Sequence, residues 1–370
     1  MRAGDSIDEL AAIVGLSYFE GIGPVRYRAL VNYFGSAAAV FRASPDELRA
    51  CGMGESLFKS FDLFRKQTDA AALIKKCESK NIHILPVEDE SYPARLREIP
   101  DAPFILYAMG DISLLQDELP FAVVGTRKPT PYGIEITRKI ANGLCDAGFT
   151  VVSGMAMGVD AVAHSTVLER SGRTIAVLGC GVDICYPAVN RRIYGQLQQK
   201  GLILSEFPPG MRSSKGVFPS RNRIIAGLSI GTLVTEGSAN SGSLITARCA
   251  AEYGRDVCAV PGPVTSAMNA APMVLLKEGA HPVGSADDII SLYKSAVGQK
   301  QTRTFVANLE TLSDHERRIV DYIRDNGSTH IDDLLRAVNG EASDTLAFVA
   351  SLEILGILHE VENGVYGLNS

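Results

Sequence analysis

Apolar and polar positions alternate along the chain in blocks that predict three regions. From residue 1 to about 75, apolar side chains recur at helical spacing, as in Leu10, Ile13 and Leu16. Between about 120 and 260, short apolar runs bounded by glycine alternate with stretches of helical length. After residue 310, three helical stretches precede a short hairpin. The pattern therefore predicts a helical region, an α/β region and a small helical module with a hairpin.

The central block contains six apolar runs that predict buried strands. The expected strands are 121–124, 150–153, 174–178, 202–205, 231–235 and 257–260. Helices are expected between them, for example over 132–147 and 159–170. Strands that alternate with helices form a parallel sheet covered on both faces. The predicted fold class is α/β, with a Rossmann-like, doubly wound, mostly parallel sheet that binds its ligand at the carboxyl ends of its strands.

The N-terminal region contains a glycine turn, Gly21-Ile-Gly-Pro24, that opens a new helix. This turn resembles the helix-hairpin-helix element, whose amides contact a DNA phosphate, and Cys51-Gly-Met-Gly54 is a weaker second copy. The other interpretation is a helical hairpin used for packing. It is favoured because Tyr27 stands where the element usually has a small residue. The region is also acidic, with 13 Lys and Arg against 18 Asp and Glu in residues 1–120.

The C-terminal region has the pattern of a winged helix. A first helix is expected over 314–325, a second begins behind a cap at Ser328-Thr329, and a third is expected over 344–355. A hairpin over 357–366, which turns at Asn363-Gly364, follows the third helix. The polar stretch before it lacks periodicity and is expected to be a linker. The expected domains are a helical helix-hairpin-helix or SAM-like domain at 1–75, a Rossmann-like domain at 76–297, a linker at 298–309 and a winged-helix domain at 310–370.

Composition narrows the class of protein. A chain of 370 residues is long enough for two or three domains. No apolar run is long enough to span a bilayer, and Met1–Leu16 lacks the pattern of a secretion signal. The seven cysteines show no spacing typical of zinc, so no metal site is expected. These features favour a protein of the reducing cytoplasm.

Charge is segregated along the chain. Residues 121–262 contain 15 Lys and Arg against 9 Asp and Glu, a net charge of +6, whereas residues 310–370 contain 4 against 12, a net charge of −8. A basic centre between acidic ends indicates an anionic ligand at the centre. The stretch 344–355 contains no Lys or Arg, so duplex DNA is disfavoured there and a protein contact is the hypothesis for this module.

Two clusters in the centre supply candidate ligands for phosphate. Phe218-Pro-Ser-Arg-Asn-Arg223 places two guanidinium groups beside an amide, and Asn240-Ser-Gly-Ser243 offers small residues at a helix start. Arg127 and Lys128 follow the glycine turn after the first strand and are expected at the same edge. Phe218 is either a base-stacking platform or a core side chain. The candidate DNA-binding residues are Arg127, Lys128, Phe218, Arg221, Asn222, Arg223, Ser241, Gly242 and Ser243.

Several enzyme classes lack their motifs. The chain contains no P-loop, no complete dinucleotide fingerprint and no nucleophile elbow. Asp160 and His164 share a helical face, but a helix cap with a packed histidine is favoured over an acid–base or metal pair. Glu236 follows a late strand, as a glutamate does in Rossmann-like enzymes acting on nucleoside monophosphates. That class is the alternative hypothesis for function.

Motifs from residue 92 to residue 280 resemble those of the DNA-processing protein A (DprA, also called Smf) family. The motifs that carry the resemblance are Val124-Gly-Thr-Arg127, Ser153-Gly-Met-Ala-Met-Gly-Val-Asp160, Ala163-His164, Tyr186-Pro187, Ser205-Glu206, Phe218-Pro-x-Arg-Asn-Arg223, Ser241-Gly-Ser-Leu-Ile-Thr-Ala247 and Pro261-Gly262, with Tyr92-Pro93 and Pro100 to Pro103 upstream. One segment departs from the family pattern: Asn269-Ala-Ala-Pro-Met273 replaces a Ser-x-Gly-x-Asn sequence. The pocket rim or the dimer contact can differ there.

The resemblance implies a bacterial cytoplasmic protein that is not an enzyme and needs no cofactor. Such a protein protects incoming single-stranded DNA and loads the RecA recombinase onto it during natural transformation. The family forms homodimers through the Rossmann-like domain. By motif position, Arg127 and Arg221-Asn-Arg223 would lie in the DNA pocket beside Ser241–Ser243. Arg127→Ala or Arg221→Ala is then expected to weaken oligonucleotide binding several fold without unfolding the protein.

Overall fold

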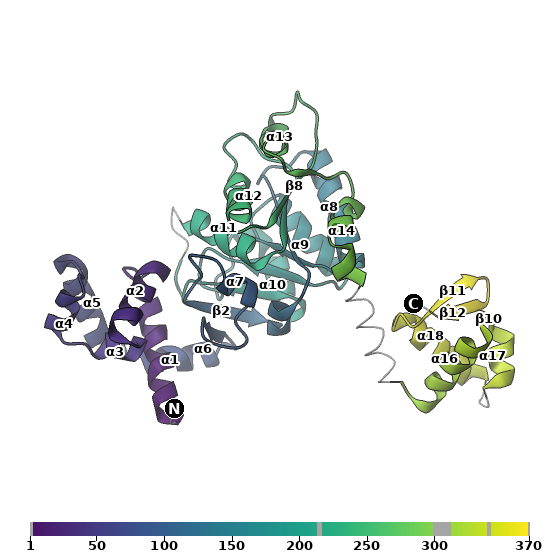
Figure 1. The fold of residues 1–370 in the computed structure, drawn as a ribbon, viewed down its shortest axis with the longest axis horizontal. Coiled ribbons are helices and arrows are strands. Elements are labelled where there is room, and N and C mark those ends of the chain that lie inside the picture. Colours follow the sequence, from purple (N-terminus) through teal and green to yellow (C-terminus); the bar gives the residue numbers. More distant parts are fainter. Residues whose placement is uncertain (1–2, 213–216, 299–311, 339–341, 369–370) are drawn as a thin grey trace. The chain divides into compact units, whose positions relative to one another are not determined.

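The computed structural model describes residues 3–212, 217–298, 312–338 and 342–368, and side chains are described except at 3–8, 217–219 and 342. The chain forms two compact units, Met1–Leu292 and Tyr293–Ser370 (Figure 1). The first unit begins with a set of helices, which a large mixed α/β region follows along the chain. The boundary expected near residue 75 falls inside this unit, and the expected domain limits stay predictions.

The first unit is built on a nine-stranded sheet with the order β1-β2-β6-β5-β4-β3-β7-β8-β9. Its strands are β1 (His83–Pro86), β2 (Ile105–Gly110), β3 (Pro120–Val124), β4 (Thr150–Ser153), β5 (Thr174–Val177), β6 (Leu202–Ser205), β7 (Gly231–Val234), β8 (Asp256–Ala259) and β9 (His281–Pro282). From β6 to β9 all neighbours are parallel. The chain builds outward from β3 to β6 and returns to add β7 on the other side of β3. Ligands of open α/β sheets bind at such a switch in strand order.

The six strands expected from the sequence are present, and their ends lie within one residue of the expected limits. The strands β3 to β7 are buried along their whole length. This burial explains why they read as continuous apolar runs rather than as alternating ones. The mixed α/β class with a mostly parallel sheet is therefore confirmed.

Three strands of this sheet were not predicted, and two of them, β1 and β2, lie at one edge of it. β1 pairs antiparallel with β2, and β2 pairs antiparallel with β6. Neither strand belongs to the strand–helix alternation that marks the parallel strands. The third, β9, is two residues long and pairs parallel with β8. Antiparallel edge strands are common on otherwise parallel sheets, so they leave the fold class unchanged.

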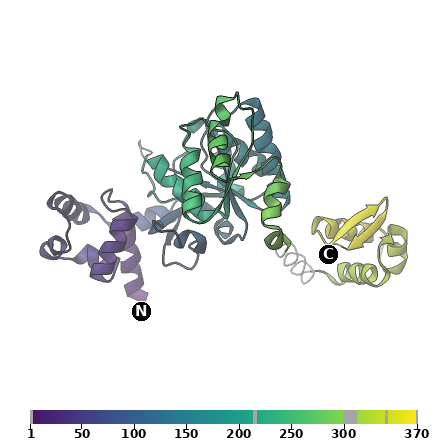
Figure 2. The same ribbon diagram turned by 45° about the horizontal axis from the view of Figure 1, so that its top comes forward.

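Helices gather around this sheet (Figures 1 and 2). On one side α8 (Pro131–Asp146) packs against α9 (Val159–Glu169) and α14 (Ala286–Leu292), and α9 packs against α10 (Arg191–Lys200). Elsewhere α11 (Val217–Leu228) packs against α7 (Ala94–Arg97) and α12 (Ser243–Glu252), and α12 packs against α13 (Ala270–Lys277). No helix in the described part of the chain is long and apolar enough to cross a membrane.

Six helices form the N-terminal part of the first unit. They are α1 (Ala3–Ser17), α2 (Pro24–Phe34), α3 (Ala37–Arg42), α4 (Pro45–Ala50), α5 (Glu55–Gln67) and α6 (Ala70–Glu78). Leu16, Leu48 and Phe61 are fully buried among them. Tyr27 of α2 stacks on Phe104 with ring centroids 4.1 Å apart. The glycine turn before α2 thus positions a packing residue, as the packing interpretation requires.

The described residues of the second unit form three helices and a three-stranded sheet of order β10-β12-β11. Its helices are α16 (Asp314–Asn326), α17 (Ile331–Ala337) and α18 (Ala342–Ile354), and its strands are β10 (Thr329–His330), β11 (Leu358–Glu362) and β12 (Val365–Leu368). Ser313 and Glu316 form a reciprocal capping box at the start of α16. Ile319, Leu334 and Leu352, one from each helix, are fully buried in a shared core.

Candidate functional site

The turns that follow β3 and β4 lie against each other at the switch in strand order. The backbone N–H of Thr126 donates to the carbonyl of Glu236 at 2.7 Å, and the N–H of Val159 donates to the carbonyl of Thr126 at 3.1 Å. Gly158 has a φ of +82° and faces the backbone of Thr126 and Arg127. Only glycine fits so close an approach in this conformation without strain. These bonds fix the turn that carries Arg127.

Arg221 projects from α11 underneath this edge of the sheet. Its side chain is 4% exposed. The Nη1 atom donates to the carbonyl oxygen of Gly154 at 2.5 Å and also to that of Val177. Burial lowers the pKa of Arg221, the charge of Asp160 raises it, and the positive charge of Arg127 lowers it. Arg127 and Arg221 line the same hollow, so an anion bound there would offset the repulsion between their charges.

Asp160 supplies the negative charge beneath the two arginines. Its carboxylate accepts hydrogen bonds from the backbone N–H groups of Gly154 at 3.2 Å and Ala156 at 3.3 Å. Burial raises the pKa of Asp160, whereas Arg221 and these hydrogen bonds lower it. The sequence placed Asp160 at a helix start beside free amides, and it does lie in the first turn of α9. The amides that it binds precede the helix, however, and no side chain caps α9 at its N-cap residue, Gly158. Its role as the countercharge of Arg221 was not predicted.

Asn222 connects α11 to the turn that opens α12. Its Nδ2 donates to the carbonyl of Gly242 at 3.1 Å, and its Oδ1 accepts from Nε of Arg221 at 3.2 Å. The hydroxyls of Ser241 and Ser243 lie 2.8 Å apart. The N-cap residue of α12 is Gly242, which has no side chain, and the hydroxyl of Ser241 accepts a hydrogen bond from the N–H of Ser243 at 3.3 Å. The turn therefore presents polar groups at the positive end of a helix.

These parts enclose a hollow of about 270 Å³, which we name the strand-end groove. Of the predicted residues, it is lined by Arg127, Arg221, Asn222, Ser241, Gly242 and Ser243. Asp160, Ser238 and Thr246 also line it and were not singled out as ligands. Asp160 was expected only as a helix cap. Sequence spacing alone cannot indicate which side of a turn faces a groove.

Lys128 and Arg223 do not line the groove, and the side chain of Phe218 lies outside the described residues. Lys128 is exposed on the turn beside Arg127, and its backbone N–H donates to Oγ1 of Thr126 at 3.2 Å. Phe218 belongs to α11, but its side chain lies outside the described residues. Its two interpretations stay open.

Arg223 does not line the strand-end groove, and its place among the DNA-binding residues stays a prediction. Its Nη2 donates to Oε2 of Glu206 at 2.5 Å, and its Nε lies 3.2 Å from Oδ2 of Asp101. The hydroxyl of Tyr253 also donates to Asp101, at 2.8 Å. Arg221 and Arg223 are two residues apart, so they leave the helix in different directions. Arg223 therefore ties α11 to β6 and to the loop after α7 instead of facing the groove.

His164 and Glu236 are both buried, and each is hydrogen-bonded to a neighbouring threonine. The Nδ1 atom of His164 is 2.7 Å from Oγ1 of Thr174, and burial lowers the pKa of His164 to about 3. Glu236 accepts hydrogen bonds from the N–H and the hydroxyl of Thr130, at 2.8 and 2.6 Å. Thr130 itself caps α8. No group of three or more metal-ligating side chains occurs within the described residues.

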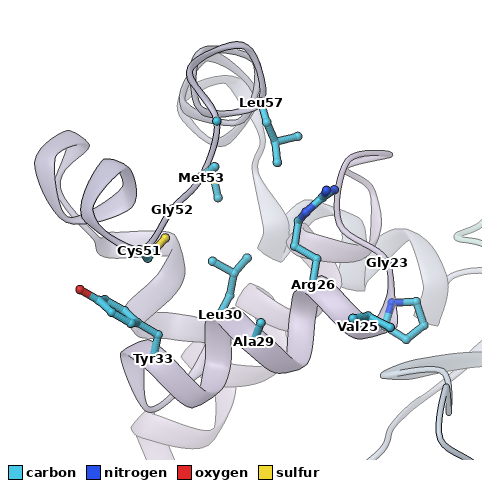
Figure 3. A pocket seen from close by; sticks show the side chains of 12 residues that line it. Gly23, Val25, Arg26, Ala29, Leu30, Tyr33, Cys51, Gly52, Met53 and Leu57 are labelled. Carbon is cyan, nitrogen blue, oxygen red and sulfur yellow. The ribbon is translucent and has the colours of Figure 1, made fainter.

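A larger hollow, of about 630 Å³, lies in the N-terminal helices between the two glycine turns (Figure 3). This N-terminal hollow is lined mainly by apolar side chains, including Leu30, Met53 and Leu57. Arg26 is the charged residue in its lining, and its Nη1 donates to the carbonyl of Gly21. The hollow therefore offers apolar surface and little free charge.

Comparisons with known proteins agree on one family. The family model described as DNA recombination-mediator protein A matches residues 83–294. Protein Smf of Synechocystis is 42% identical over 257 residues, which cover 68% of this chain and 65% of that protein, just under two thirds of its length. DNA processing protein DprA of Streptococcus pneumoniae is 40% identical over 228 residues, covering 62% of this chain and 79% of that protein.

Solved structures give the same result. The X-ray structure of DNA processing protein A from Streptococcus pneumoniae matches with a TM-score of 0.65 and 32% identity, covering 78% of this chain and 96% of that one. DNA processing protein A from Helicobacter pylori, described for its single-stranded DNA binding mode, matches with a TM-score of 0.53 and 31% identity, covering 58% and 96%. The family match spans more than half of the chain and coincides with the sheet that forms the strand-end groove. The chain belongs to the DNA recombination-mediator protein A family.

Proposed function

We propose that the chain binds single-stranded DNA in the strand-end groove and takes part in DNA processing. The observation that carries this proposal is the meeting of Arg127, Arg221 and the Ser241–Ser243 turn in one groove. Two guanidinium groups and the start of a helix form a site for a phosphate. The related protein of Helicobacter pylori is described as binding single-stranded DNA, which supports the same class of ligand here.

The groove suits a flexible strand better than a duplex. Arg221 is buried, so a phosphate must enter the groove to approach it. A single strand can bend one phosphate inward, whereas the phosphates of a duplex follow a stiff helix. Asn222 and the hydroxyls of Ser241 and Ser243 add neutral donors. Binding is then expected to depend on salt and little on sequence.

The wider role follows from the family. We propose that the chain acts in the cytoplasm during natural transformation, as a homodimer formed through its Rossmann-like domain, and loads RecA onto the bound strand. We also assign the helices of residues 1–75 to a helix-hairpin-helix or SAM-like domain. Residues 310–370 are assigned to a winged-helix domain. The acidic composition of α18 supports a protein contact for that module.

The alternative is an enzyme that acts on nucleoside monophosphates, with Glu236 as its catalytic group. The contacts of Glu236 weigh against this role. Its two carboxylate oxygens bind the N–H and hydroxyl of Thr130, and it does not line the strand-end groove. A binding protein without catalysis and without a cofactor is therefore the proposal. Release of base or phosphate from nucleoside monophosphates, lost on Glu236→Gln, would instead establish the enzyme.

The first test compares labelled single-stranded and double-stranded oligonucleotides by fluorescence anisotropy across a range of salt concentrations. We expect the single strand to bind more tightly, and Arg127→Ala to weaken it about tenfold because a charge-assisted hydrogen bond is lost. The slope of log affinity against log salt should also fall by about 0.7. Lys139→Ala is the matched control, since Lys139 is an exposed cation on α8 outside the groove. Equal effects of the two substitutions would refute the assignment of the groove.

A further inference from the structure

A second, smaller hollow of about 30 Å³ adjoins the strand-end groove. Arg127, Ala156 and Arg221 line both spaces, so the two hollows are neighbours. The far wall of the smaller hollow is formed by Met157, from the turn after β4, and by Tyr186, from the loop after β5. Met157 is 45% exposed and Tyr186 is 43% exposed. An apolar surface therefore begins where the cationic groove ends.

The two loops that carry these side chains are held together. Nδ2 of Asn190 donates to the carbonyl oxygens of Met155 at 2.8 Å and Ala156 at 3.2 Å. The hydroxyl of Tyr194 donates to the carbonyl of Val182 at 2.6 Å and anchors the other end of the Tyr186 loop. Side chains on anchored loops lose less conformational freedom when they bind a ligand. Met157 and Tyr186 thus form one surface that is preorganised for binding.

Positive charge continues beyond this surface. Arg191 and Arg192 open α10 and are exposed. Within the described structure, neither guanidinium group takes part in an ion pair. The carboxylate of the same loop, Asp183, is already paired with Lys80 at 2.6 Å. Cations in the first turn of a helix oppose the helix dipole, and a bound anion would offset that repulsion.

An exposed aromatic ring between two sets of cations is the arrangement that binds a single strand. The bases stack on the ring while the phosphates on either side pair with the cations. A methionine beside the ring adds a polarisable surface for the same contact. A duplex cannot use this surface without unstacking its bases. The arrangement therefore fits a strand with exposed bases.

We propose that single-stranded DNA leaves the strand-end groove past Ala156, stacks a base on Tyr186 and Met157, and directs its next phosphates toward Arg191 and Arg192. This inference rests on the proposed function of the groove and extends it. It assigns to the loop after β5 and to the start of α10 a second contact with the strand. Short oligonucleotides would fill the groove alone, and longer ones would also reach Tyr186.

The chain contains no tryptophan, so Tyr186→Trp introduces a single fluorescent reporter. We expect its emission to be quenched by an oligothymidine of about 16 nucleotides and much less by one of about 4. Leu63→Trp is the control, because Leu63 lies on α5, is 58% exposed and lines neither hollow. Equal quenching at both positions, or none at Tyr186→Trp, would overturn the proposed path.

The second arm measures affinity for the same two oligonucleotides. Tyr186→Ala should weaken the longer one about tenfold and leave the shorter one unchanged, and Tyr186→Phe should retain the affinity because the ring remains. The double variant Arg191→Ala with Arg192→Ala should have a lower affinity for the longer oligonucleotide, and this affinity should depend less on salt. If the unchanged protein binds neither oligonucleotide, the proposed function fails. If it binds both and these variants match it, the extended path alone fails.

Discussion

The strand-end groove and the N-terminal hollow differ in what their walls can offer a ligand. The N-terminal hollow encloses about 630 Å³, more than twice the 270 Å³ of the groove. Both lie where glycine turns open helices without a side-chain cap, at Gly23 and Gly54 in one and at Gly242 in the other. The hollow presents apolar side chains and Arg26, whereas the groove presents two arginines, an amide and two hydroxyls.

The difference shows that the volume of a hollow and the presence of a glycine turn say little about phosphate binding. Recognition of an anion needs an excess of positive charge around the site. Residues 1–120 contain 13 Lys and Arg against 18 Asp and Glu, whereas residues 121–262 contain 15 against 9. The groove therefore lies in a part of the chain whose net charge favours an anion, whereas the N-terminal hollow lies in a part whose net charge disfavours one.

The largest effect is expected from Arg221→Ala, which removes a buried charge of the groove. Asp160 would be left buried without its countercharge, which costs about 3–5 kcal/mol. Urea denaturation should show this loss in the free energy of unfolding, and DNA binding should be abolished. The expectation from sequence, that Arg221→Ala leaves the fold intact, is replaced because Arg221 is 4% exposed and bonded to backbone carbonyls.

A double variant separates the two consequences. Asp160→Asn removes the unpaired charge while its side-chain oxygen can still accept from the N–H groups of Gly154 and Ala156. Combined with Arg221→Ala, it should recover much of the stability and none of the binding. A double variant no more stable than Arg221→Ala alone would contradict the role of Asp160 as countercharge.

The contrast between Arg221 and Arg223 also marks the limit of prediction from sequence. Apolar runs predicted six strands because burial on both faces leaves a local signal, and glycine turns then placed Arg127 and Ser241–Ser243 at one edge. Arg223 has the same local signal as Arg221. Its partners, Glu206 and Asp101, are distant in sequence and become neighbours through the fold. The antiparallel strands β1 and β2 were missed for a similar reason, since their pairing follows no strand–helix alternation.

The second-largest expected effect is a pH dependence of the free energy of unfolding, which distinguishes the two regions. His164 is buried on α9, and its pKa falls from about 6.5 in the unfolded chain to about 3 in the folded one. Because the folded form resists protonation, stability from this group is complete above pH 6.5 or so and is lost as pH falls toward about 3. The slope is about 1.4 kcal/mol per pH unit for one proton. The N-terminal hollow has no histidine in its lining.

Urea denaturation between about pH 7 and about pH 4 measures this loss of stability. Subtracting the free energy of unfolding of the His164→Gln protein from that of the unchanged protein at each pH removes the contribution of the exposed carboxylates, which both proteins share. His330→Gln is a control because His330 is exposed in the other unit. The His164→Gln protein should lose less stability as the pH falls. Parallel curves for the two proteins would mean that His164 does not resist protonation.

The smallest effect is expected from Arg26→Ala, the counterpart of Arg127→Ala in the other region. Each substitution removes an exposed arginine near a glycine turn. Arg26 donates to the carbonyl of Gly21 and lies among apolar side chains, so its loss should change the affinity for single-stranded DNA less than about twofold. Anisotropy with the same labelled oligonucleotide measures both variants. A loss as large as that of Arg127→Ala would mean that the glycine turns at 21–24 and 51–54 do contact phosphate, and that the helix-hairpin-helix interpretation is right. Because the chemical change is the same in both variants, the surroundings of the two arginines are then the variable that decides binding.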